Sequence, residues 1–163
     1  MRSRPNARAS GRGQDRILAK NKRARHSFHI LEELEVGLVL VGTEVKAIRE
    51  GQIHLKDAYV EFRDGEAYLS RAHVGPYSHG NQQNHKAERS RKLLLKKHEL
   101  DRLFGRVKTR GLTVVPLEVR LRNGWIKVLV GLAQGKKLHD KRQAEKQKEL
   151  DREAREAMGQ RRW

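Results

Sequence analysis

The stretch LTVVPLEVRLRNGWIKVLVGL, residues 112–132, decides the fold of this chain. Two runs rich in apolar and β-branched residues, Leu112–Leu121 and Trp125–Leu132, flank the dipeptide Asn123-Gly124. Asn-Gly between such runs is typical of a two-residue hairpin turn, because both turn residues must adopt a positive φ. The stretch therefore predicts two long antiparallel strands.

A second hairpin is predicted earlier in the chain. Ala58, Val60 and Phe62 alternate with polar or amphipathic neighbours, so one face of this strand is apolar. Asp64-Gly65 then supplies a two-residue turn signal, and Glu66–Val74 provides the returning strand.

Two helices are predicted between the strands. Thr43 can cap a short helix over Glu44–Arg49 that ends near Gly51. A longer helix is indicated by four apolar residues at helical spacing, followed by Gly111. These apolar residues are Leu100, Leu103, Phe104 and Val107.

Further apolar clusters, Ser27–Leu31 and Gly37–Val41, lie on either side of Glu32-Glu33 and predict two more strands. About six short strands with two or three helices indicate a mainly β fold with α elements. We predict a small antiparallel β-barrel of the OB type over residues 21–135, an architecture that often binds nucleic acid. Fold alone does not establish that function.

The charge of the chain favours a polyanionic partner. Lys and Arg number 37 against 20 Asp and Glu, a formal net charge of +17. Such an excess favours nucleic acid first and an anionic membrane surface second, and it opposes self-association, so we expect a monomer. No apolar run approaches the roughly 20 residues that span a bilayer, and we expect no membrane partner.

The two ends of the chain differ from the middle. Residues 1–25 hold nine Lys and Arg against one acid and few apolar side chains. We predict a disordered basic arm, assigned to residues 1–20. Residues 136–163 hold many helix formers but only a thin apolar stripe. Pairs such as Lys141–Glu145 and Arg152–Glu156 stabilise a helix only weakly, so we expect this basic tail to be largely unfolded alone and helical on a partner.

The sequence does not indicate an enzyme or a metal protein. Cys is absent, which suits a reducing compartment, and we expect a cytoplasmic protein. The eight His are scattered, and no zinc, phosphate-loop or serine-nucleophile motif occurs. A metal between His79 and His85 is less favoured than a solvated loop. We therefore predict no catalysis, no cofactor and no metal.

Several basic and apolar blocks follow one another in a specific order. They are Asn21-Lys22-Arg23-Ala24-Arg25-His26, Glu35–Leu40, Gly42–Lys46, Leu55–Tyr59, Asp64-Gly65-Glu66, Arg91–Leu95, Gly111–Leu117 and Lys136–Arg142. Together, from about Asn21 to Arg142, they resemble the SmpB family, the SsrA-binding proteins. Each block alone is weak, but the ordered set is specific.

The resemblance implies a protein that binds the tRNA-like domain of tmRNA (SsrA RNA) and brings it to stalled 70S ribosomes. There tmRNA supplies alanine and a reading frame for a degradation tag, in the process of trans-translation. The resemblance implies no catalysis by the protein itself. A ribosomal or general RNA-chaperone protein with the same barrel is the alternative, and a small nuclease is a weaker one.

Three residues match positions on the family's RNA-binding face: Glu35, Leu94 and Lys127. An acid at an RNA face can accept hydrogen bonds from bases or 2′-hydroxyls, whereas Lys adds affinity for phosphate. Glu35 could instead be a turn carboxylate, and Leu94 could be ordinary core. On electrostatic grounds we add five residues that could meet phosphates. These are Arg23, Arg25, His26, Lys46 and Arg91.

The resemblance also assigns part of the tail to the ribosomal decoding centre and mRNA channel. The matching residues are Gly135, Lys136, Lys137, His139, Asp140, Lys141 and Arg142. A tail that folds in an empty mRNA channel would sense the absence of a codon. Two departures occur: Lys86-Ala87-Glu88 replaces a common Asp-Pro, and Lys96 stands where the family often has a base-reading side chain.

Overall fold

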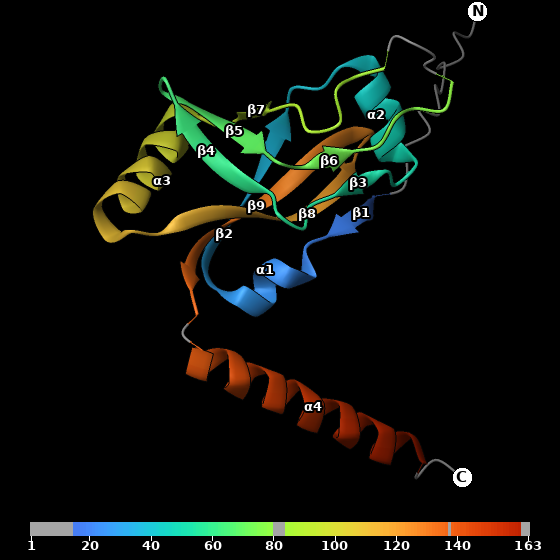
Figure 1. Cartoon of the computed structure of the whole chain (residues 1–163), viewed down its shortest axis with the longest axis vertical. Coiled ribbons are helices and arrows are strands. Elements are labelled where there is room, and N and C mark those ends of the chain that lie inside the picture. The colour runs from blue at the N-terminus through green and yellow to red at the C-terminus, as the bar shows by residue number, and fades with distance from the viewer. Residues whose placement is uncertain (1–14, 80–83, 137, 161–163) are drawn as a thin grey trace, which may run out of the picture.

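The computed structural model describes residues 15–79, 84–136 and 138–160 (Figure 1). The strands are β1 (Arg16–Lys20), β2 (Phe28–Leu38), β3 (Ile53–His54), β4 (Tyr59–Arg63), β5 (Glu66–Ser70), β6 (His73–Val74), β7 (Arg91–Leu94), β8 (Thr113–Arg122) and β9 (Trp125–Gly135). The helices are α1 (Lys22–Ser27), α2 (Gly42–Arg49), α3 (Lys97–Arg110) and α4 (Leu138–Gln160).

An antiparallel sheet forms the centre of the molecule. In the described residues, seven strands pair in the order β1-β8-β9-β2-β7-β5-β4, and β3 pairs with β6 separately. The sheet curls so that β4 contacts β8, yet no described ladder joins them. The predicted mainly β fold with helices is confirmed, and its barrel is open, with β1 and β4 at the edges.

Both predicted hairpin turns are present where the dipeptides indicated them. Asp64 and Gly65 have φ of 50° and 73°, and Asn123 and Gly124 have φ of 50° and 80°. Both residues of each turn are left-handed, as a type I′ turn requires. Gly111, with a φ of 62°, caps the C-terminus of α3 as predicted.

The apolar side chains form two clusters on the two faces of the sheet. The larger cluster contains Val114 and Val119 of β8, which share a face because the register shifts between Pro116 and Glu118, and Val128 of β9. Ile48 of α2 and Leu103 of α3 pack in the same cluster. Successive strand residues point to opposite faces. The intervening residues form the second cluster, which α1 covers through Ala24. Its buried members are Ala24, Val115, Leu117, Leu129 and Ala133.

The boundary of the predicted basic arm at residue 20 is wrong. Arg16–Lys20 form β1 and pair with β8, because Leu18 and Ala19 pack against the core. Residues 1–14 lie outside the described part of the chain. The helix α1 was not predicted; it begins at Asn21, whose side-chain oxygen accepts a hydrogen bond from the Ala24 N–H at 3.1 Å.

Three further element boundaries differ from the predictions. The strand β2 runs unbroken through Glu32-Glu33, with a register shift between Ile30 and Glu32. Thr43 is not the N-cap of α2, since the side chain of Glu44 accepts from the Val41 N–H at 3.0 Å. The predicted strand after Gly65 is divided into β5 and β6 by Arg71, which has a φ of 60°.

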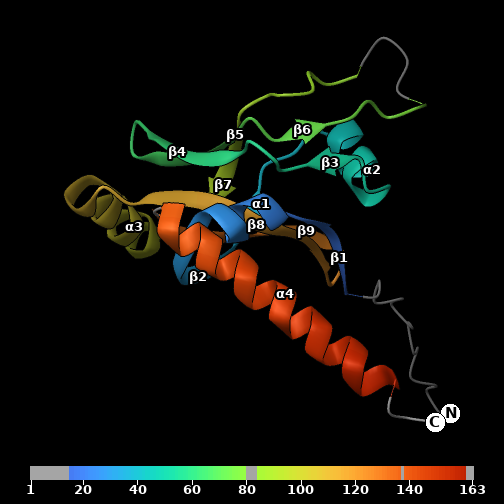
Figure 2. The same ribbon diagram turned by 60° about the horizontal axis from the view of Figure 1, so that its bottom comes forward.

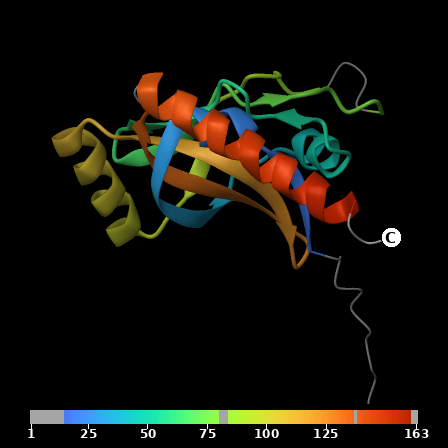
Figure 3. The same ribbon diagram turned by 90° about the horizontal axis from the view of Figure 1, so that it is seen from below.

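The tail is a helix that projects from the sheet (Figures 2 and 3). Almost all described residues of α4 are exposed. Arg152 and Glu156 form the expected pair at 3.7 Å, whereas Glu145 pairs with His26 of α1 at 2.7 Å instead of with Lys141. The tail is therefore helical in the structure and contacts the body at α1. Whether it is unfolded alone and helical on a partner stays a prediction.

Candidate RNA interface

The strand register aligns side chains across one surface of the sheet. Gly37 of β2 lies opposite Leu94 of β7 on one side and Lys127 of β9 on the other. Lys127 in turn lies opposite Arg120 of β8. Directly opposed residues share a face of the sheet, so Leu94, Lys127 and Arg120 form a row with Gly37 between them.

The space above Gly37 is occupied by Leu94. A Cβ added at Gly37 would lie 3.3 Å from the Leu94 Cβ, so the glycine lets this side chain lean across the strand. Leu94 is 53% exposed, and its interpretation as ordinary core is therefore wrong. An exposed leucine in the same row as Lys127 and Arg120 offers an apolar contact for a base or a ribose.

Glu35 lies on the same face, two residues before Gly37 in β2. Its Oε2 is 3.5 Å from Arg120 Nη1 and 3.3 Å from Arg122 Nη1. It is a strand residue, so its interpretation as a turn carboxylate is also wrong. A carboxylate accepts about four hydrogen bonds, which leaves Glu35 Oε1 available to RNA donors.

The arginines beside Glu35 were missed at the sequence level. Arg120 also contacts Glu118 at 2.8 Å, and this hydrogen bond raises the pKa of Arg120 above its ordinary value. Arg120 and Arg122 alternate with the apolar residues Val119 and Leu121, so the period of two already placed Arg120 on the polar face of the predicted strand. Arg122 continues the same alternation one residue beyond the predicted end of that strand.

Trp125 was also missed. It lies opposite Arg122 next to the hairpin turn and is 72% exposed, which makes its indole available for stacking on a base. A bulky aromatic directly after a predicted Asn-Gly turn was the available signal. We call these six side chains the sheet face. Its members are Glu35, Leu94, Arg120, Arg122, Trp125 and Lys127.

Three of the five added cationic residues lie on α1, beside the sheet face. Arg25 is 3.2 Å from Glu33 and 3.9 Å from Glu118, the acid that also holds Arg120. Arg23 points away, toward Asp57 at 3.5 Å, and His26 contacts the tail. Hence the structure brings Arg25 to the border of the sheet face but not Arg23.

Lys46 and Arg91 are not part of the sheet face. Lys46 lies on α2 with its ammonium 5.3 Å from the centre of the Tyr77 ring. Arg91 has no exposed surface, because its guanidinium pairs with the buried carboxylate of Glu44 and donates to Ala72 O at 2.9 Å. The prediction that Arg91 meets RNA is wrong.

The tail residues assigned to the ribosome follow the last strand. Gly135 ends β9, and the Lys136 N–H donates to Ser27 O at 3.0 Å. The backbones of His139, Asp140, Lys141 and Arg142 lie in the first turns of α4. Lys137 and the side chains of His139 and Asp140 lie outside the described residues.

Comparison with known proteins identifies the family of the chain. A family model described as SmpB protein matches residues 18–160. The chain belongs to the SmpB family. The matched residues include the whole sheet face and all of α4.

Relatives of this SmpB chain are similar over most of their length. An SsrA-binding protein of Pelobacter propionicus is 47% identical over 144 residues, which cover 88% of this chain and 95% of the relative. One from Enterococcus faecalis is 49% identical over 142 residues, covering 87% and 92%. A chain from a solved structure described as tmRNA-SmpB in the bacterial ribosome is 48% identical, with a TM-score of 0.62 over 74% of this chain and 85% of that one.

Proposed function

We propose that this chain binds tmRNA through the sheet face and delivers its tRNA-like domain to stalled 70S ribosomes for trans-translation. Stalled ribosomes are thereby rescued and nascent peptides are tagged for degradation. The observation that carries the proposal is the row of Leu94, Lys127 and Arg120 beside Glu35, on a chain of the SmpB family.

The sheet face combines the contacts that structured RNA requires. Arg120, Arg122 and Lys127 supply positive charge for phosphates, and Leu94 and Trp125 supply exposed apolar surface. Glu35 forms ion pairs with both arginines through the same carboxylate oxygen. This arrangement selects an RNA whose shape places donors near the carboxylate and phosphates around it.

The tail acts on the ribosome in this proposal. The basic residues at its start, together with His139, track phosphates and bases in the decoding centre and the empty mRNA channel, following the family resemblance. The tail touches the sheet body at α1 through exposed side chains, so it can leave that position at little cost.

The protein binds and positions RNA and performs no reaction itself. Among the described residues, no cluster of three metal-ligating side chains occurs. No described helix has the length and apolar character to cross a bilayer. We place the protein in the cytoplasm, where its RNA partners are, and expect it to act as a monomer because of its charge. Incubating an RNA with the pure protein and Mg²⁺ tests the absence of nuclease activity.

A competition titration tests the proposed function. The pure protein is titrated against labelled tmRNA at moderate salt, with an unrelated structured RNA of equal length as competitor. We expect tmRNA binding to persist when the competitor is in excess. The unrelated RNA could instead displace tmRNA equally well, and the affinity for both RNAs could fall together as the salt concentration rises. This result would support only a general basic RNA-binding protein.

Substituting Glu35→Ala is expected to weaken tmRNA binding about tenfold, or about 1.4 kcal/mol, although the protein becomes more basic. The change removes an RNA acceptor and frees Arg120 and Arg122 from their ion pairs. The affinity is measured by the same titration.

The matched control for this substitution is Glu33→Ala. It removes the same charge from the same strand, where Glu33 pairs with Arg25 at the border of the sheet face. We expect unchanged or slightly tighter binding. If both variants bind tmRNA more tightly than the original protein, Glu35 has no role in recognition.

A further inference from the structure

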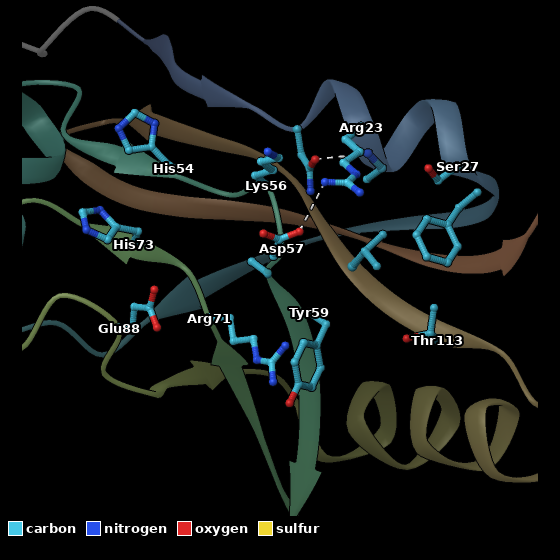
Figure 4. Close-up of a pocket in the computed structure, with 15 residues that line it drawn as sticks. Arg23, Ser27, His54, Lys56, Asp57, Tyr59, Arg71, His73, Glu88 and Thr113 are labelled. Carbon is cyan, nitrogen blue, oxygen red and sulfur yellow. Dashed lines mark hydrogen bonds and ion pairs between the residues drawn. The ribbon is translucent and has the colours of Figure 1, made fainter.

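A groove separate from the sheet face lies between α1, the segment joining β3 to β4, and the junction of β5 and β6 (Figure 4). Its volume is about 790 Å³, within the roughly 300–1,000 Å³ range of sites that enclose small ligands. No residue of the sheet face lines it. The groove and the sheet face therefore share no residue.

Three cations from three different elements line this groove: Arg23, Lys56 and Arg71. Arg23 is paired with Asp57 at 3.5 Å, but both side chains are more than half exposed, so the pair is weak. In the described structure, neither Lys56 nor Arg71 has an acidic side chain within ion-pair distance. Glu88 is the other acid of the groove and lies at its His73 end, away from Lys56 (Figure 4).

The backbone at Arg71 is left-handed, with a φ of 60°. Glycine adopts this conformation freely, whereas a side chain makes it costly, and such positions concentrate at functional sites. The next residue is fixed, because Ala72 is fully buried and its carbonyl accepts a hydrogen bond from the buried Arg91 at 2.9 Å. The core thus holds an arginine where a glycine would fit with less strain.

The position of Arg71 places its guanidinium beside an exposed aromatic ring. The Arg71 Cζ is 5.9 Å from the centre of the Tyr59 ring, and Tyr59 is 36% exposed. The imidazole rings of His54 and His73, whose centres are 6.0 Å apart, lie at the other end of the groove (Figure 4). Aromatic faces interleaved with cations are the pattern that binds unpaired bases and their phosphates. An acidic peptide would use the cations but not the rings.

We propose that this groove binds a second, single-stranded segment of RNA, with a base stacked on Tyr59 and phosphates held by Arg71 and Lys56. The chain then contacts RNA at two separate surfaces, the sheet face and the groove. A single-stranded stretch of the RNA bound at the sheet face, or one of the ribosome, has the chemistry that this groove accepts.

The proposal is tested with Arg71→Gly in the full chain. Glycine tolerates a φ of 60°, so this variant loses the cation while its thermal unfolding midpoint stays equal or rises. Binding of a fluorescein-labelled hexauridylate, measured by polarisation, is expected to weaken about tenfold, and equally in Tyr59→Ala. Competition with unlabelled hexaadenylate and with a hexaglutamate peptide completes the measurement.

The matched control is Arg63→Ala. Arg63 stacks on Tyr68 at 4.5 Å at the far end of the same hairpin, outside the groove. We expect this variant to keep the original affinity for hexauridylate. Equal weakening in Arg63→Ala and Arg71→Gly, or displacement by hexaglutamate as efficient as by hexaadenylate, would overturn the proposal. A photo-crosslink from a thiouridine probe to the sheet face rather than to Tyr59 would overturn it as well.

Discussion

Removal of residues 139–163 is expected to abolish peptide tagging while changing tmRNA affinity by less than about twofold. The sheet is complete without the tail, because β9 ends at Gly135 and the Lys136 N–H then donates to Ser27 O. The contact between His26 and Glu145 joins two exposed side chains and contributes little to stability. The sheet face is therefore unchanged in the truncated protein.

The loss of tagging follows from the position of the ribosome-directed residues. The truncation removes His139, Asp140, Lys141 and Arg142 and leaves only Gly135, Lys136 and Lys137 of the assigned set. The tmRNA then reaches the ribosome on a protein that lacks the helical part of the tail. Tagging is measured on an mRNA without a stop codon in a reconstituted translation system, and tmRNA affinity by titration.

A point substitution separates the loss of the tail from the loss of its docking. Glu145→Gln removes the acidic partner of His26 but keeps every residue assigned to the decoding centre. We expect tagging close to that of the original protein. Normal tagging by the truncated protein, in contrast, would show that the tail has no part in the reaction.

Substitution of Glu44→Ala is expected to lower the free energy of unfolding by about 3–5 kcal/mol. Glu44 has no exposed surface, and its two carboxylate oxygens pair with Arg89 and with the fully buried Arg91. Removing the carboxylate leaves the Arg91 charge inside the core without a counter-ion. Urea denaturation monitored by tryptophan fluorescence measures the change.

The control is another glutamate paired with a neighbouring strand residue. Glu66 lies 3.4 Å from Lys92, and both side chains are more than two-fifths exposed. Such pairs contribute about 0–1 kcal/mol, so the free energy of unfolding of Glu66→Ala should stay close to that of the original protein. Similar unfolding of the Glu44→Ala and Glu66→Ala variants would mean that the buried pair is not needed for stability.

The same buried carboxylate gives a dependence of stability on pH. Burial alone would raise the pKa of Glu44, but hydrogen bonds from Arg89, the Val41 N–H and Arg91 outweigh it and lower the pKa. A carboxyl group with a depressed folded pKa stabilises the fold fully above its unfolded value, about 4.3, and this stabilisation is lost as the pH falls through the folded value. The original protein and Glu44→Gln should therefore differ less in their free energy of unfolding when urea denaturation is repeated below about pH 4. A difference in the free energy of unfolding that stays constant with pH would show that folding does not lower the pKa of Glu44.

The interactions that the sequence predicted well are local. The two type I′ turns depend on residues that accept a positive φ, Asp64-Gly65 and Asn123-Gly124, and the strands around them follow from alternation. Gly111 terminates α3 for the same local reason. The alternation of Arg120 and Arg122 with apolar neighbours also contained two of the six members of the sheet face.

The features that the sequence misassigned depend on distant partners. Arg91 belongs to a basic cluster in the sequence, yet Glu44, 47 positions earlier, draws it into the core. The residues of β1 look like part of a disordered arm because their pairing partner, β8, lies about a hundred positions later. Neither the spacing of apolar residues nor the composition of a segment can reveal such a partner, because both describe residues that are neighbours in the chain.

By itself, the sequence determined the two hairpins, the mainly β architecture, the excess of positive charge and the family resemblance, since each depends on residue types in a short window or in a fixed order. Only the tertiary structure decided which cations are free for RNA. Burial and pairing removed Arg91 from that set, and strand register gathered Glu35, Leu94, Lys127 and the two arginines from four strands onto one face. The groove at Tyr59 and Arg71 likewise exists only after folding, because its walls come from segments that meet when the sheet curls and α1 packs beneath it.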